Sequence, residues 1–181
     1  NMANADGINN LWSPAAGVSG ALVINNVAAG FSYYTQGANT GSVAISGLDF
    51  SGSSDAVNLY YQAGDGFANT GSVTLNSVEV VNIHTVDTTA AANTAQVSIT
   101  TLTDTAAVTV VVDGGLGVSL GATALAGTAI TSLDASGLTG TGAPGGFTWT
   151  TGALAGAATI KGSAAGTNTV DFTLATKAVT Y

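Results

Sequence analysis

The chain has 181 residues, of which 46% are hydrophobic, 25 are glycine and only 7% are charged. Its formal net charge is -8, because ten carboxylates face two lysines and no arginine, so it lacks the cationic patch that nucleic-acid binding requires. The absence of cysteine excludes disulfides, thiolate metal sites and a cysteine nucleophile.

Short runs of β-branched and aromatic residues, bounded by Gly, Asn, Asp or Ser, recur along the chain and predict strands. In chain order they are residues 21–24, 42–45, 57–61, 72–75, 78–83, 96–100, 108–112, 117–120, 147–150, 158–160 and 169–174. The Ala-rich segment 121–129 lacks a helical apolar register, and residues 136–146, which include Pro144, are expected to form a loop. Apart from one helical turn expected within residues 1–12, the pattern predicts an all-β domain.

Residues 38–50 return as residues 68–80, with six identical positions and conservative replacements such as Ile45 by Leu75. An offset of 30 fits a supersecondary unit that stacks on its neighbour, and the many small residues also favour stacking. A parallel β-solenoid of short stacked strands is therefore expected, with Val73 and Leu75 inward and Ser72 and Thr74 outward. An antiparallel β-sandwich stays open as the alternative.

The whole chain, residues 1–181, is expected to form a single repetitive β domain with a sub-boundary near residues 90–95. Because it opens on Asn1 and stops within an alternating pattern, it is interpreted as a piece of a longer protein. The longest apolar runs, such as residues 106–112, are too short to span a bilayer, so no membrane insertion is expected.

Catalysis is not expected. His84 is the only histidine, and a triad of a serine, His84 and Asp87 would lack the Gly-x-Ser-x-Gly elbow. Carbohydrate-active β-helix enzymes pair acids with a lysine or arginine, whereas Lys161 and Lys177 do not adjoin an acidic cluster in the sequence. A carbohydrate-active enzyme is kept as the least favoured alternative.

Calcium is the one cofactor that the composition suggests, because aspartates in Gly-rich turns provide carboxylate oxygens, and the turn backbone provides carbonyl oxygens, for hard cations. The candidate ligands are Asp49, Asp55, Asp65, Asp113 and Asp134. The calcium nonapeptide Gly-Gly-x-Gly-x-Asp-x-apolar-x is absent from the sequence, so turn formation by Asp and Gly is the competing interpretation.

Threonine and aromatic residues suggest two further surfaces. Threonines in residues 100–105 and 148–151 could form rows like those of ice-binding solenoids, although no Thr-x-Thr recurs at a constant period, and ordinary solvent-facing threonine is the alternative. The aromatic clusters at residues 31–34 and 59–61 could stack on sugars, contact a protein, or fill the end of a β core.

The second half of the chain resembles RTX-type bacterial surface-layer proteins and large repetitive adhesins. The resemblance is carried by residues 131–140, with the phrase Leu-Asp-Ala-Ser, and by residues 158–172, with Gly-Ser-Ala-Ala-Gly-Thr-Asn-Thr. In that family such phrases often precede calcium-binding β-roll repeats, and the mature proteins tile the cell exterior as lattices. The resemblance therefore implies a bacterial cell-surface location and calcium at contacts between coils or subunits.

Together these observations predict an extracellular, non-catalytic surface protein that self-associates into a lattice or filament through strand edges and acidic turns. Low charge reduces the repulsion that opposes dense packing. A module that binds a cell-surface glycan is the alternative function.

Overall fold

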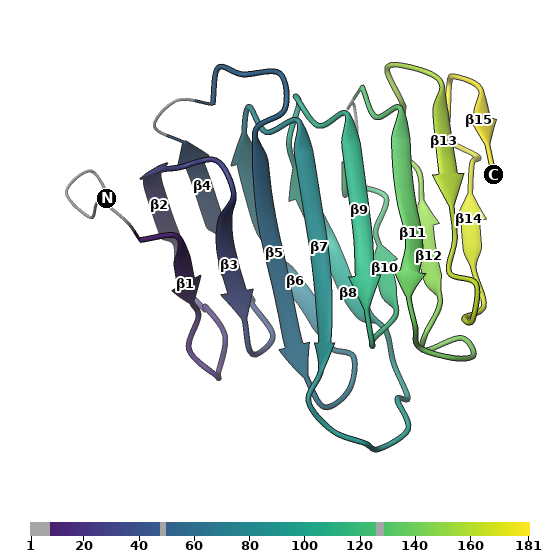
Figure 1. Ribbon diagram of the computed structural model, residues 1–181, viewed down its shortest axis with the longest axis horizontal. Coiled ribbons are helices and arrows are strands. Elements are labelled where there is room, and N and C mark those ends of the chain that lie inside the picture. The colour runs from purple at the N-terminus through teal and green to yellow at the C-terminus, as the bar shows by residue number, and fades with distance from the viewer. Residues whose placement is uncertain (1–7, 48–49, 126–128) are drawn as a thin grey trace.

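The computed structural model describes residues 8–47, 50–125 and 129–181, and over these residues the chain is an all-β parallel solenoid. Successive strands alternate between two sheets that face each other, so one strand from each sheet forms one coil (Figure 1). Sheet A has the order β1-β3-β5-β7-β9-β11-β13-β15, and sheet B has the order β14-β12-β10-β8-β6-β4-β2. All pairs between these strands are parallel, which confirms the solenoid and rules out the antiparallel sandwich.

The strands are short, as a coiled chain of this kind requires. Sheet A contains β1 (Asn10–Trp12), β3 (Phe31–Thr35), β5 (Ala56–Ala63), β7 (Val80–Asp87), β9 (Thr109–Gly114), β11 (Ser132–Leu138), β13 (Ala158–Lys161) and β15 (Val179–Thr180). Sheet B contains β2 (Leu22–Val27), β4 (Val43–Gly47), β6 (Ala68–Asn76), β8 (Val97–Thr103), β10 (Val118–Leu120), β12 (Phe147–Thr150) and β14 (Thr169–Asp171).

The internal repeat of the sequence is a pair of neighbouring strands. Val43 lies beside Val73 and Ile45 beside Leu75, so residues 30 apart are in register between β4 and β6. Val73 and Leu75 are buried and Ser72 and Thr74 are partly exposed, which confirms the expected orientation. The repeat therefore reports stacking of one coil on the next.

The core consists of columns of apolar side chains between the two sheets. In sheet A one column contains Phe31, Val57, Val81, Val110, Leu133 and Ile160, all buried. In sheet B, Ile99, Leu120 and Trp149 lie in register, and all three are at most 1% exposed. Each such side chain contributes roughly 1.5–3 kcal/mol by leaving water, so the columns are the main stabilising feature of the fold.

Two local expectations differ from the structure over the residues that it describes. No helical turn forms in residues 8–12, because Asn10–Trp12 is β1 and pairs with β3, and the rest of the expected range, residues 1–7, lies outside the described residues. Residues 136–138, expected in a loop, belong to β11, where the register shift between Asp134 and Gly137 marks an irregularity that the sequence pattern does not show. Both sheets continue across residues 90–95, where the sub-boundary is expected.

A short ladder of buried asparagines joins three coils where the chain enters sheet B. The backbone N–H of Val18 donates to Asn39 Oδ1 at 2.8 Å, and the N–H of Asn39 donates to Asn69 Oδ1 at 3.1 Å. Asn39 is 2% exposed and Asn69 is 1% exposed. Since buried N–H groups need partners, these side chains stand in for ladder hydrogen bonds between coils.

Asn69→Ala is therefore expected to lower the free energy of unfolding by about 1–3 kcal/mol, because the buried Asn39 N–H loses its acceptor. Urea unfolding followed by tryptophan fluorescence measures the change. Asn76→Ala is the control, since Asn76 lies in the same strand but is exposed. Equal effects of the two substitutions would contradict a special role for the buried ladder.

Candidate functional site

The outer face of sheet A carries a column of stacked rings. Trp12, Tyr34, Tyr60 and His84 occupy the same register position on β1, β3, β5 and β7. Their ring centroids are separated by 4.0, 4.4 and 4.5 Å, with interplanar angles of 10°, 9° and 24°. These distances match the spacing between parallel strands, so the solenoid itself imposes the stacking.

The stacking decides which rings are free to bind anything else. Both faces of Tyr34 and Tyr60 are covered by their neighbours in the column. In the part of the chain that the structure describes, Trp12 stacks on Tyr34 alone and is 50% exposed. Its open face points toward the N-terminal end of the solenoid.

The aromatic clusters of the sequence thus divide between two environments. Tyr33 and Tyr61 are each 1% exposed and belong to the core, where burial raises the pKa of both hydroxyls. Tyr34 and Tyr60 belong to the outer column. The core interpretation of the clusters therefore holds for Tyr33 and Tyr61, whereas Tyr34 and Tyr60 stack on rings of their own chain.

His84 ends the ring column and contacts an acid on the next coil. Its Nδ1 lies 2.6 Å from Asp113 Oδ1, and the two residues are in register between β7 and β9. The carboxylate partner of His84 is therefore Asp113, whereas the triad considered from the sequence used Asp87. The pair lies on the outer face of sheet A, where the His84 side chain is 22% exposed and the Asp113 side chain 40% exposed.

A second outer column on sheet A is polar. Asn82 Nδ2 donates to Asn58 Oδ1 at 2.8 Å, and Asn58 Nδ2 donates to Ser32 Oγ at 3.2 Å. At the far end of the same column, Lys161 Nζ lies 2.9 Å from Asp134 Oδ2. Val111 lies between these two groups in the column, so the polar side chains join coils at its two ends.

The predicted calcium ligands lie in separate turns and strands. Asp49 falls outside the described residues. Asp55 Oδ2 accepts a hydrogen bond from the backbone of Gly52, and Asp113 binds His84. Asp65 Oδ1 accepts from the backbone N–H groups of Gly66, Thr94 and Ala95, while Asp134 binds Ser136 and Lys161. Over the described ranges no group of three or more His, Cys, Asp or Glu side chains could hold a metal ion.

Hydrogen bonds to two of these carboxylates favour their charged form. The Thr94 hydroxyl and backbone lower the pKa of Asp65 to about 2. The Ser136 hydroxyl and the Lys161 ammonium lower the pKa of Asp134, also to about 2. Both aspartates therefore stabilise turns or contacts between neighbouring coils of one chain by hydrogen bonding. This is the role expected of Asp in turns.

The outer face of sheet B is almost uncharged. Asp171 in β14 is the only charged residue in its seven strands, all of which the structure describes. Ser98, Ser119, Thr148 and Thr169 form one outward column, and Thr74 lies beside Ala44 and Thr103 in another. The rows thus mix Ser, Thr and Ala, and a regular threonine array of the ice-binding type does not form on these strands.

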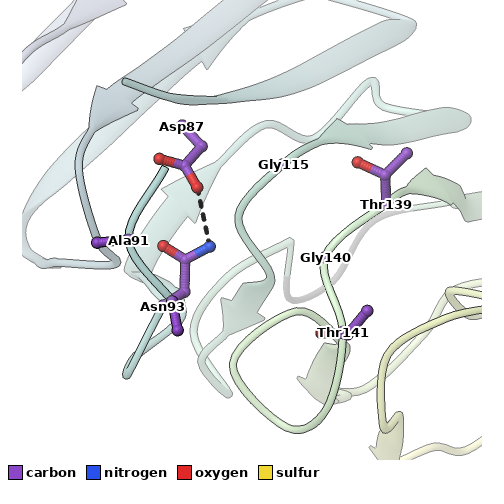
Figure 2. Close-up of a pocket in the computed structure, with 8 residues that line it drawn as sticks. Asp87, Ala91, Asn93, Gly115, Thr139, Gly140 and Thr141 are labelled. Carbon is purple, nitrogen blue, oxygen red and sulfur yellow. Dashed lines mark hydrogen bonds between the residues drawn. The ribbon is translucent and has the colours of Figure 1, made fainter. Parts of the chain in front are cut away.

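One polar hollow of about 350 Å³ lies at the loops that follow sheet A strands (Figure 2). Asp87, Asn93, Gly115, Thr139 and Thr141 are among its lining residues, and Asn93 Nδ2 donates to Asp87 Oδ2 at 3.1 Å. The Asp87 carboxylate also accepts from the Thr89 backbone. His84 and the lysines do not line this hollow, so it does not combine an acid with a basic side chain.

Exposed large apolar side chains gather at the two ends of the solenoid. Those of the described residues are Ile8, Trp12 and Val23 near β1 and β2, and Phe172, Leu174 and Tyr181 near β14 and β15. Their exposed fractions range from 37% for Phe172 to 61% for Tyr181. No large apolar side chain of the intervening described coils is exposed to that degree.

The sequence analysis missed the ring column and the gathering of exposed apolar side chains near the two ends. The signal was present, because Trp12, Tyr34, Tyr60 and His84 align once β1, β3, β5 and β7 are placed in register. The strand registers could not be read from the sequence, since coil lengths vary.

The described residues include no helix that could cross a membrane. Comparison with protein-family models, curated proteins and solved structures found no match to this chain.

Proposed function

We propose that this chain is a non-catalytic structural segment of an extracellular bacterial surface protein, of the surface-layer or adhesin kind, and that it self-associates. The observation that carries the proposal is the concentration of exposed apolar side chains on or beside the end strands of the described solenoid. Open strand edges present unpaired N–H and C=O groups, which template pairing with another chain. Assembly covers both the edges and the apolar residues.

The body of the solenoid supports this role because its side chains are used internally. The ring column, the asparagine column and the Asp134–Lys161 pair all join one coil to the next. Stacked coils that contact only their neighbours form a stiff, quasi-one-dimensional element. Such an element suits load bearing and tiling.

Calcium is proposed as a bridge between copies. Carboxylates of two molecules could complete a coordination shell, since the described aspartates of one chain are dispersed. Asp55 and Asp113 are candidates because they are partly exposed. A chelator is then expected to weaken lateral contacts between assembled particles.

Electron microscopy and light scattering of the purified 181-residue chain test the proposal, with calcium and with chelator. Filaments or sheets that grow with protein concentration are expected. Assembly is expected to be stronger at about 0.15 M salt than at about 0.01 M. Copies that each carry a net charge of -8 repel one another, and salt screens that repulsion. Dispersed monomers under all of these conditions would contradict self-association.

Glycan binding is the second candidate, favoured by one feature. Trp12 offers an open indole face beside a hollow lined by Leu11, Pro14, Val18 and Leu22, and indole faces stack on sugar rings. A glycan array measures it. Binding that is lost in Trp12→Ala, by a chain that stays monomeric, would favour this function over assembly.

A further inference from the structure

We infer that Tyr34 and Tyr60 form an oxidative cross-linking site, at which a one-electron oxidant joins the two phenol rings, and with them the strands β3 and β5, through a dityrosine bond. This site goes beyond the proposed function and does not depend on self-association, because both tyrosines belong to one chain. Three features support it: the contact between the two rings, the neighbours that hold them, and the places of the other tyrosines.

The two phenol rings lie one above the other on the outer face of sheet A, where β3 and β5 run side by side (Figure 1). Tyr34 and Tyr60 are in register, and their ring centroids are 4.4 Å apart with an interplanar angle of 9°. The hydroxyls are also close: burial contributes most to the raised pKa of Tyr60, and the Tyr34 phenol raises it further, in part through a hydrogen bond. The ortho carbons of one ring therefore lie beside those of the other.

Neighbouring side chains hold this pair in place. The His84 ring stacks on the other face of Tyr60, with 4.5 Å between the ring centroids, and its Nδ1 lies 2.6 Å from Asp113 Oδ1. Beside the rings, Asn58 Nδ2 donates to Ser32 Oγ at 3.2 Å and so joins β5 to β3. The two phenols are thus positioned before any reaction, which is the condition under which a step within one molecule outpaces the same step between molecules.

The coupling of the two phenols is a two-electron oxidation. Each phenol gives one electron to the oxidant and its hydroxyl proton to water, which leaves two phenoxyl radicals in contact. A carbon–carbon bond forms between one ortho carbon of each ring, and the hydrogen on each of these carbons then moves to the ring oxygen, which restores both phenols. Hydrogen peroxide, acting through a haem peroxidase, accepts the two electrons and two protons, and its O–O bond breaks to give two molecules of water.

The other tyrosines of the chain are placed differently. Tyr33 and Tyr61 are each 1% exposed and face the core, so an oxidant in solution does not reach them. Tyr181 is 61% exposed, but it follows β15, at the opposite end of sheet A from β3 and β5. Of the five tyrosines, all of which the structure describes, Tyr34 and Tyr60 alone combine partial exposure with contact between two phenol rings.

Treatment of the folded 181-residue chain with peroxidase and hydrogen peroxide tests the inference. The chain carries Tyr181→Phe throughout, which removes coupling between molecules at that exposed position. Dityrosine fluorescence is expected in a product that still migrates as a single chain under denaturing conditions. A protease that cuts before aspartate separates Tyr34 from Tyr60 at Asp55 in an unlinked chain, so mass spectrometry of the digest is expected to find the two peptides joined.

Two comparisons assign the product to the stacked pair. Tyr60→Phe is expected to abolish the cross-link, whereas Tyr33→Phe is the matched control and is expected to keep the full yield, since Tyr33 lies next to Tyr34 in β3 but faces the core. Unfolding the chain in urea before oxidation is expected to lower the yield at least about tenfold, because the rings then meet only through chance closure of a loop. Equal yields from the folded and the unfolded chain would overturn the inference.

Stability gives a second readout. A bond between Tyr34 and Tyr60 closes a loop in the unfolded chain, so the oxidised chain is expected to unfold at a urea concentration about 1 M higher than the untreated chain, measured by circular dichroism. Oxidised Tyr60→Phe is the control for other oxidative damage and is expected to show no such rise. Absence of dityrosine, a cross-link that joins Tyr34 to Trp12 instead, or dityrosine found only between molecules would overturn this site and leave the proposed self-association untouched.

Discussion

Gly71→Ala is expected to destabilise the solenoid by about 3 kcal/mol, because the alanine Cβ has no space. A Cβ built at Gly71 lies 1.9 Å from the carbonyl oxygen of Gly41 on the neighbouring coil. The obstacle is backbone, which moves only if the two coils separate. Separation would also break the hydrogen bond from the Gly71 N–H to the Asn39 carbonyl, which is 2.9 Å long.

Urea unfolding of the variant measures this effect, and Gly20→Ala provides a matched control. Gly20, Gly41 and Gly71 follow one another on successive coils, and a Cβ at Gly41 would lie 2.0 Å from the Gly20 carbonyl oxygen. At Gly20 itself, on the outermost of the three coils, a Cβ would have no heavy atom within 4 Å. Gly20→Ala is therefore expected to be nearly neutral, and a similar loss in both variants would contradict the close-approach explanation.

These glycines also show why the sequence predicted the fold well. The repeated phrase Ala-Asn-Thr-Gly-Ser-Val at residues 38–43 and 68–73 contains the buried asparagine, the close-approach glycine and the first inward valine of a coil. All three residues contact the neighbouring coil, so their repetition in the sequence indicates that the coils stack. Inward alternation, as in Val73 and Leu75, supplied the orientation.

Apart from β11, the strands that the sequence analysis missed lack this alternation or are very short. β3 carries Phe31, Ser32, Tyr33 and Thr35, which are all buried, so its pattern does not alternate between inside and outside. β1 and β15 have three and two residues and become strands because a neighbour pairs with them. Their existence depends on tertiary structure, which no local pattern contains.

The candidate site was less predictable than the fold. Contacts such as His84 with Asp113, or Lys161 with Asp134, join residues 29 and 27 positions apart, and other coils have different lengths. A fixed offset of 30 therefore cannot identify them. The five aspartates proposed as calcium ligands were chosen by turn composition, which equally predicts the backbone-binding role that Asp65 plays.

Asp104 differs from those aspartates because it is buried, with 2% of its surface exposed. Burial raises its pKa from 3.8 to about 6, and the nearby Glu79 charge acts in the same direction, while hydrogen bonds from the Ala106 and Val78 backbone partly oppose them. The folded chain therefore holds this proton more tightly than the unfolded chain. Stability is unaffected by this group below about pH 4 and falls as the pH rises through about 6.

The raised pKa of Asp104 corresponds to roughly 3 kcal/mol of folding stability that is lost above pH 6. Asp65 and Asp134 behave in the opposite way. Their lowered pKa values contribute stability that is present above about pH 4 and is lost as the pH falls toward 2. The two effects meet near pH 4, so the free energy of unfolding is expected to be greatest in that region, well below neutral pH.

Asp104→Asn isolates the buried carboxylate, because the amide stays neutral at every pH. At each pH the unfolding free energy of the natural chain is subtracted from that of the variant. This difference is expected to be about 3 kcal/mol larger at pH 7.5 than at pH 4. Comparing two pH values cancels any fixed cost of burying the amide. Asp65→Asn is the opposing control, expected to lose stability at pH 7.5 and to approach the natural chain near pH 2. An Asp104→Asn effect that is the same at pH 4 and pH 7.5 would show that this carboxyl group does not titrate in the interval, and the stability maximum would then lie nearer neutral pH.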